Sequence, residues 1–154
     1  MKPKGRLNRR CGASAAIAAA CLLFFLHGCS AVTSRPDNSL YERLGGYPVV
    51  RAVVGDVVDR TAANPKSKQS FDEVNVKNLK KSIVEQICSL TEGPCTYGGD
   101  DMQTAHKGLN ISEGEFNILA EELRQALDAH GVGTREKNEL LRILAPMKRD
   151  IVTR

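Results

Sequence analysis

The spacing of apolar residues between Ser39 and Arg154 is the strongest constraint on how this chain can fold. In the segment 76–90, apolar side chains recur at steps of three and four residues, namely Val76, Leu79, Ile83, Ile87 and Leu90. Such steps place side chains on one face of a helix. No stretch of this region alternates apolar and polar residues in the way that a half-buried strand does. The spacing therefore predicts an all-α fold.

Glycine, proline and capping residues set the boundaries of the other expected helices. Three of these helices are expected at residues 40–44, 49–63 and about 101–109. Two more are expected to begin after Ser112 and after Thr134, and Thr134 is the expected N-cap of the last one. Pro48 suits the first position of the second helix. Ser112 and Glu115 form a capping box, and Asn75 caps the helix at 76–90. Pro146 is expected to bend the last helix or to break its hydrogen-bond ladder.

The N-terminal 28 residues differ in composition from the rest of the chain. They contain five Lys or Arg residues and no acidic residue, and an uncharged stretch runs from Gly12 to Leu26. About fifteen residues are too few for a membrane span, which needs about twenty, and the layout is typical of a secretion signal. The end of this segment, Leu-His-Gly-Cys at 26–29, resembles a bacterial lipobox, in which the cysteine becomes lipid-modified.

This resemblance predicts a signal peptide at 1–28, a flexible tether at 29–38 and a folded domain at 39–154. It implies a lipid anchor on Cys29 and a place on the periplasmic side of a bacterial membrane, with the outer membrane favoured in a Gram-negative host. An ordinary cleaved signal with an incidental cysteine is the alternative. In an oxidising compartment, Cys88 and Cys95 are an even pair, which either forms a disulfide or leaves Cys88 as a buried free thiol.

Nucleic acid is not an expected partner of this chain. Residues 29–154 carry 17 basic and 18 acidic groups, so the net charge of +4 comes from the first 28 residues. A basic surface that would contact phosphates is therefore not indicated. Trp is absent and aromatic residues make up only 5% of the chain, which leaves little for base stacking.

Histidine is scarce after the leader, where only His106 and His130 remain. His130 precedes Gly131 at an expected helix end, where histidine commonly stabilises the helix dipole. His106 lies on a short helix with apolar neighbours, and periodicity alone favours a structural role over a ligand role. No carboxylate pair, serine elbow or phosphate-binding glycine loop indicates hydrolytic chemistry.

The segment 97–109, Tyr-Gly-Gly-Asp-Asp-Met-Gln-Thr-Ala-His-Lys-Gly-Leu, resembles the haem-binding segment of truncated haemoglobins, especially their group I. Four other segments of the chain resemble segments of the same family in the same order, namely residues 39–46, 71–75, 79–87 and 145–147. The resemblance covers residues 39–154. It implies a two-over-two helical sandwich around one b-type haem (iron protoporphyrin IX), with His106 as the iron ligand and a diatomic gas as the bound partner.

The resemblance also implies which side chains surround the haem. Met102 lies one helical turn before His106, and the other expected contacts are Tyr97, Ile111, Phe116 and Leu119, with Phe71, Leu79 and Ile83 on the distal wall. Family members often place hydrogen-bond donors over the gas at positions that match Val58, Leu79 and Ile83 here. None of these three can donate, and we expect Ser82 and Gln86 to face elsewhere. Tight retention of oxygen is therefore not expected, since polar bound oxygen gains most from such donors.

These features leave three hypotheses for the function. The first is a haem protein that reversibly binds oxygen, carbon monoxide or nitric oxide, in an oxygen-carrier type of role. The second is a haem enzyme, a nitric-oxide dioxygenase or a peroxidase, which would need an electron source from an unknown redox partner. The third is a helical lipoprotein adaptor without haem, against which the retention of His106 with its spaced Met102 and Phe116 argues.

Overall fold

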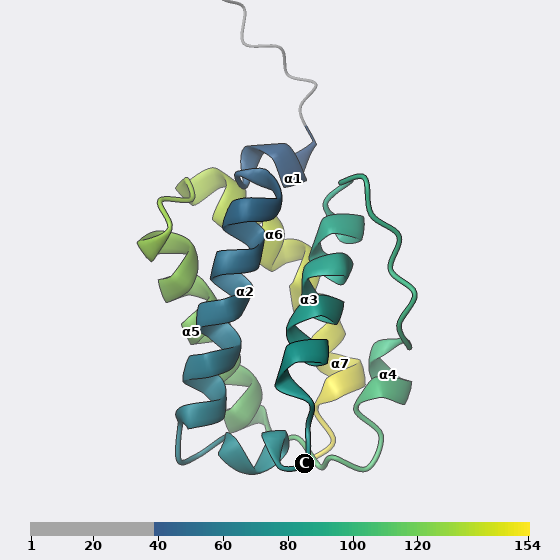
Figure 1. Cartoon of the computed structure of the whole chain (residues 1–154). Helices are drawn as coiled ribbons and strands as arrows, with labels where there is room; N and C mark the ends of the chain where they lie inside the picture. Colours follow the sequence, from purple (N-terminus) through teal and green to yellow (C-terminus); the bar gives the residue numbers. More distant parts are fainter. Residues whose placement is uncertain (1–38) are drawn as a thin grey trace, which may run out of the picture. The chain divides into compact units, whose positions relative to one another are not determined.

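Helices account for most of residues 39–154, the part of the chain that the computed structural model describes (Figure 1). In chain order they are α1 (Leu40–Arg43), α2 (Gly46–Ala63), the 3₁₀ helix η1 (Lys68–Phe71), α3 (Val76–Leu90), α4 (Met102–Ala105), α5 (Glu113–Ala129), α6 (Thr134–Leu144), the 3₁₀ helix η2 (Ala145–Met147) and α7 (Lys148–Ile151). No strand occurs in this region, which confirms the predicted all-α class. The predicted signal, the tether and Cys29 lie outside the described residues.

The helix α2 is central, because it packs along α5 on one side and α3 on the other (Figure 1). It therefore buries residues on more than one face, including Val53, Val54, Val57 and Val58. The helix α5 is joined to the C-terminal segment, because Glu113 of α5 pairs with Lys148 of α7, and Leu127 of α5 and Leu140 of α6 share one buried cluster. Together with the pair α2–α3, this segment and α5 make up the two-over-two arrangement. No helix within residues 39–154 is long and apolar enough to span a membrane.

The start of α2 differs from the prediction, because the helix begins at Gly46 and not at Pro48. Pro48 still lies in the first turn, where its missing N–H has no intrahelical acceptor. The preceding Gly45 has a φ of +100°, and a Cβ at that position would lie 2.4 Å from Val49 Cγ2. Only glycine therefore fits this approach to the helix.

The helix α3 has the predicted bounds, and the Asn75 side chain caps it by accepting from the Asn78 N–H at 3.1 Å. Near its end, the buried Cys88 forms a disulfide with Cys95, with 5.7 Å between the two Cα atoms. The Gly93 N–H donates to the Cys88 carbonyl at 2.7 Å. The bridge thus ties the C-terminal end of α3 to the connection that leads to α4.

Two of the later helices differ from their predicted bounds. The helix α4 ends at Ala105, well before residue 109, because the chain turns at Gly108 with a φ of +81°. The N-cap of α6 is Gly133, and Thr134 is the first helical residue. Pro146 breaks the ladder as predicted, since a 3₁₀ turn separates α6 from α7.

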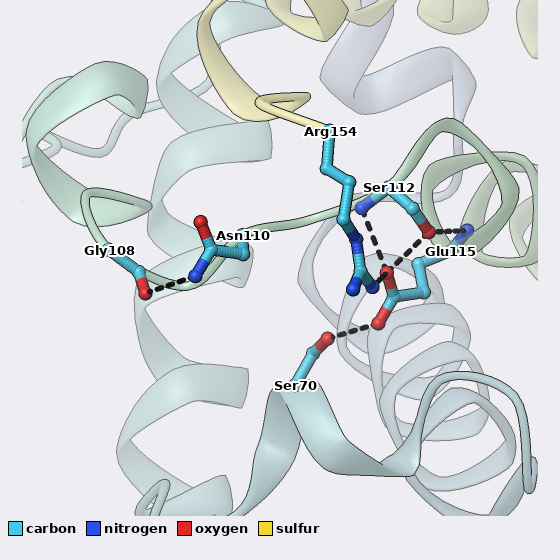
Figure 2. Close-up of polar contacts among 6 residues, drawn as sticks. All are labelled: Ser70, Gly108, Asn110, Ser112, Glu115 and Arg154. Carbon is cyan, nitrogen blue, oxygen red and sulfur yellow. Dashed lines mark hydrogen bonds and ion pairs between the residues drawn. The ribbon is translucent and has the colours of Figure 1, made fainter.

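The N-terminus of α5 is fixed by a cluster of polar contacts around Glu115 (Figure 2). The predicted capping box is present, with the Glu115 N–H donating to Ser112 Oγ at 3.2 Å and the Ser112 N–H donating to Glu115 Oε2 at 2.8 Å. The Ser112 hydroxyl also donates to Glu115, and the Ser70 hydroxyl donates to Glu115 Oε1 at 2.7 Å. Arg154 Nη2 lies 3.3 Å from Glu115 Oε2. The hydrogen bonds from Ser112 and Ser70 lower the pKa of Glu115 from 4.5 to about 2.

Candidate functional site

A cavity of about 870 Å³ lies between the helices, with walls from α2, α3, α4, α5, α6, η2, α7 and the connection before α4. Its volume is within the range of sites that hold cofactors and other small molecules. Apolar side chains dominate its walls, as such sites require. The cavity is therefore the candidate functional site.

His106 lines this cavity from the C-terminal end of α4. Its Nδ1 lies 2.9 Å from the Met102 carbonyl oxygen. Because a carbonyl can only accept, Nδ1 is the donor in this contact, and Nε2 is the ring nitrogen left for a metal. A hydrogen bond of this kind sets the tautomer and orientation of metal-binding histidines. The chain thus presents a half-buried, oriented imidazole of the kind that binds haem iron.

His130 has a different environment. It is the C-cap of α5, and its Nε2 lies 3.0 Å from Asp56 Oδ2 in an exposed polar contact. His130 does not line the cavity, so His106 is the one histidine on the cavity walls within residues 39–154. In the same residues, no group of three or more His, Cys, Asp or Glu side chains is arranged to hold a bare metal ion.

Most of the residues predicted to surround the cofactor line this one cavity. They are Val58, Leu79, Ile83, Tyr97, Met102, His106, Phe116 and Leu119. Val58 is fully buried on α2, and neither it nor Leu79 nor Ile83 carries a hydrogen-bond donor. The three positions therefore form an apolar stretch of wall.

Phe71 and Ile111 do not line the cavity in this structure. Phe71 ends η1 and packs, partly buried, against the hydrophobic core. Ile111 is buried beside the C-terminal segment, and its carbonyl accepts from the Thr153 N–H at 3.0 Å. Both positions depend on contacts between distant segments, which the local sequence pattern does not contain.

Ser82 and Gln86 line the cavity, contrary to their expected facing. The spacing explains this, because Leu79, Ser82, Ile83 and Gln86 follow steps of three and one that place them along one stripe of α3. The Gln86 side chain reaches from α3 to α4, where its Nε2 donates to Met102 Sδ at 3.4 Å. The α3 wall therefore combines apolar side chains with two polar ones.

Polar groups also occupy the wall near Tyr97. The Tyr97 hydroxyl donates to the Asp100 carbonyl at 2.9 Å, which closes the loop before α4. Burial, followed by the charges of Asp100 and Asp101, raises the pKa of Tyr97, so the phenol stays protonated at neutral pH. At the exposed rim, Arg124 Nη1 and Glu121 Oε2 lie 3.7 Å apart.

Comparisons with known proteins point to one family. The family described as bacterial-like globin matches residues 39–153. A group 1 truncated haemoglobin of Mycolicibacterium paratuberculosis is 32% identical over 115 residues, which cover 75% of this chain and 85% of that protein. One from a Nostoc species is 27% identical, over 76% of this chain and 99% of its own length. The ferric crystal structure of Tetrahymena pyriformis truncated haemoglobin superposes with a TM-score of 0.71 at 26% identity, and covers 76% of this chain and all of that one.

Proposed function

Since the chain belongs to the bacterial-like globin family as a group 1 truncated haemoglobin, we propose that it holds one b-type haem through His106 and reversibly binds a diatomic gas. The observation that carries this proposal is the geometry of His106. Its Nδ1–H is held by the Met102 carbonyl at 2.9 Å, which leaves Nε2 free on the wall of the cavity. A haem held by His106 would supply an iron centre able to bind a diatomic gas.

The side chains of the cavity suit this cofactor. Phe116 and Leu119 provide apolar surface from α5, and Val58 and Ile83 provide it from α2 and α3. These side chains exclude water from the slot, while Met102 lies one turn from the proposed ligand. The chain thus offers an oriented imidazole in a mainly apolar cavity of sufficient volume, which is the combination that b-type haem requires.

Haem titration tests this proposal on the full chain. We expect the absorption of added haem to change until one equivalent is bound, and the ferrous form to give the spectrum of a five-coordinate histidine complex. Carbon monoxide should then bind reversibly. A chain that shows no saturable haem uptake would contradict the proposed function.

The choice among gases follows from the apolar wall. Val58, Leu79 and Ile83 cannot donate a hydrogen bond, and the Gln86 amide on the same cavity wall already donates to Met102, so we propose that oxygen is held less firmly than in a globin with a donor at one of these three positions. Carbon monoxide and nitric oxide depend less on such donors. We therefore place gas binding with rapid oxygen release ahead of nitric-oxide dioxygenation, which needs long-lived bound oxygen.

We also propose that the chain is exported and anchored to a membrane through lipid on Cys29. The N-terminal composition and the Leu-His-Gly-Cys segment support this proposal. The Cys88–Cys95 bridge supports it as well, because disulfides persist mainly in oxidising compartments. A Cys29→Ser chain should leave the membrane fraction or stay unprocessed. Normal processing together with unaltered membrane association would argue against the anchor.

A further inference from the structure

Gln86 is the polar side chain that connects α3 with the short helix that precedes His106. Its Nε2 donates to Met102 Sδ at 3.4 Å. No other side-chain hydrogen bond joins α3 to α4 within residues 39–154. We propose that Gln86 is a positioning residue for His106 and acts through Met102. This inference rests on the proposed function, because it concerns the histidine proposed to bind the iron.

Met102 makes hydrogen bonds through both its side-chain sulfur and its backbone carbonyl. Its sulfur accepts from Gln86, and its carbonyl oxygen accepts from the backbone N–H of His106 at 3.2 Å and from His106 Nδ1 at 2.9 Å. The same residue therefore contacts the α3 wall and sets the tautomer of the imidazole. A shift of Met102 moves the acceptor that orients His106.

The helix α4 also packs against the C-terminal helix α7, but this packing includes no side-chain hydrogen bond to α3. The helix has four residues, and Gln103, Thr104 and Ala105 are all exposed. Its N-cap is Asp101, which binds Thr104 of the same helix at 2.8 Å and so adds no contact with α3. The hydrogen bond from Gln86 therefore adds a polar contact with α3 to the packing of α4 against α7.

The disulfide does not replace this contact. Cys88 follows Gln86 by two residues on α3, and its partner Cys95 lies on the connection to α4. Residues 96–101 separate Cys95 from Met102, which is enough chain for α4 to shift while the bridge stays intact. The disulfide fixes the connection at Cys95, and the hydrogen bond from Gln86 contacts the chain at Met102, where the connection ends.

The size of the effect follows from the chemistry of the contact. A methionine side chain has three rotatable bonds, and its thioether is a weak acceptor. Without the donor, Met102 gains conformations and the imidazole loses part of its support. The net contribution of one weak hydrogen bond corresponds to about a two- to fivefold change in the rate of haem loss.

The test uses the full chain loaded with haem and the variant Gln86→Met, which keeps the length of the side chain and removes the donor. We expect the iron–histidine stretching frequency of the ferrous form to shift or broaden in resonance Raman spectra. Haem transfer to excess apomyoglobin should become about two- to fivefold faster. The matched control is Gln125→Met, because Gln125 binds Glu121 at 3.1 Å on α5 and does not line the cavity. This control should change neither measurement.

A second variant shows whether Gln86 acts through Met102. Met102→Leu removes the acceptor and should also alter the stretching frequency, and adding Gln86→Met to it should have no further effect. An unchanged frequency in either single variant, or a full additional effect in the double variant, would overturn the inference. A wild-type chain that takes up no haem would instead contradict the proposed function.

Discussion

The carboxylate of Glu115 is the group whose removal should cost this fold the most electrostatic stability. Its pKa is lowered from 4.5 to about 2, because the carboxylate accepts hydrogen bonds from Ser112 and Ser70. One pKa unit corresponds to about 1.4 kcal/mol, so the ionised group contributes about 3 kcal/mol to the free energy of unfolding at neutral pH. Only 11% of its side chain is exposed, so solvent screens these contacts little.

The sign of the pH dependence follows from the direction of the shift. Because the folded-state pKa lies below that of the unfolded chain, the contribution is complete above about pH 4.5 and is lost as the pH falls toward 2. We expect Glu115→Gln to lower the free energy of unfolding by about 2–3 kcal/mol at pH 7, since the amide cannot accept all of these hydrogen bonds. The difference between the two proteins should shrink between pH 4.5 and pH 2.

Urea unfolding, followed by circular dichroism at several pH values, measures this difference. Glu113→Gln is the matched control, because Glu113 also lies in the first turn of α5 and pairs with Lys148, but 65% of its side chain is exposed. Its substitution should cost clearly less than that of Glu115, because solvent screens the exposed Glu113–Lys148 pair. Equal losses for the two variants at pH 7, or a Glu115→Gln difference that persists unchanged at pH 2, would refute the reasoning.

The remaining predictions concern the bridge and the apolar wall. Replacing Cys88 and Cys95 by serine should lower the free energy of unfolding by about 2.5 kcal/mol, the chain-entropy value for an eight-residue loop. Alkylation of the oxidised protein, followed by intact-mass analysis, should label neither cysteine, and labelling of both would rule out the bridge. Val58→Tyr should slow oxygen release about ten- to a hundredfold, because a donor to a polar bound gas contributes about 1.5–3 kcal/mol. If stopped-flow measurement shows slow release in the unmodified protein and no change in the variant, another donor on the cavity wall, Ser82 or Gln86, holds the oxygen and the apolar-wall reasoning is wrong.

The elements with clear local signals were predictable from the sequence. The bounds of α3 follow from the Asn75 cap and the apolar stripe, and the start of α5 follows from its capping box. The end of α4 and the helix η1 were not predictable in the same way. The turn after His106 depends on the left-handed conformation of Gly108, and a four-residue 3₁₀ helix has no periodic pattern to detect.

Some residues of the site were likewise predictable from local sequence, and others depend on packing between distant segments. His106, Met102 and Tyr97 come from one short segment, so their meeting on one wall depends mainly on local structure. Phe71 and Ile111 depend on how distant segments pack, and neither lines the cavity. Gln86 was expected to face elsewhere, although it shares a helical stripe with Leu79. Its contact with Met102 joins two helices and becomes visible only in three dimensions.

The central claim is that His106 is the iron ligand, and resonance Raman spectroscopy of the ferrous full chain tests it most directly. The unmodified protein should show an iron–histidine stretching band. His106→Ala should lose this band and retain haem poorly, whereas His130→Ala should keep the band, because His130 pairs with Asp56 away from the cavity. A His106→Ala protein with the same iron–histidine band as the unmodified chain would contradict the account.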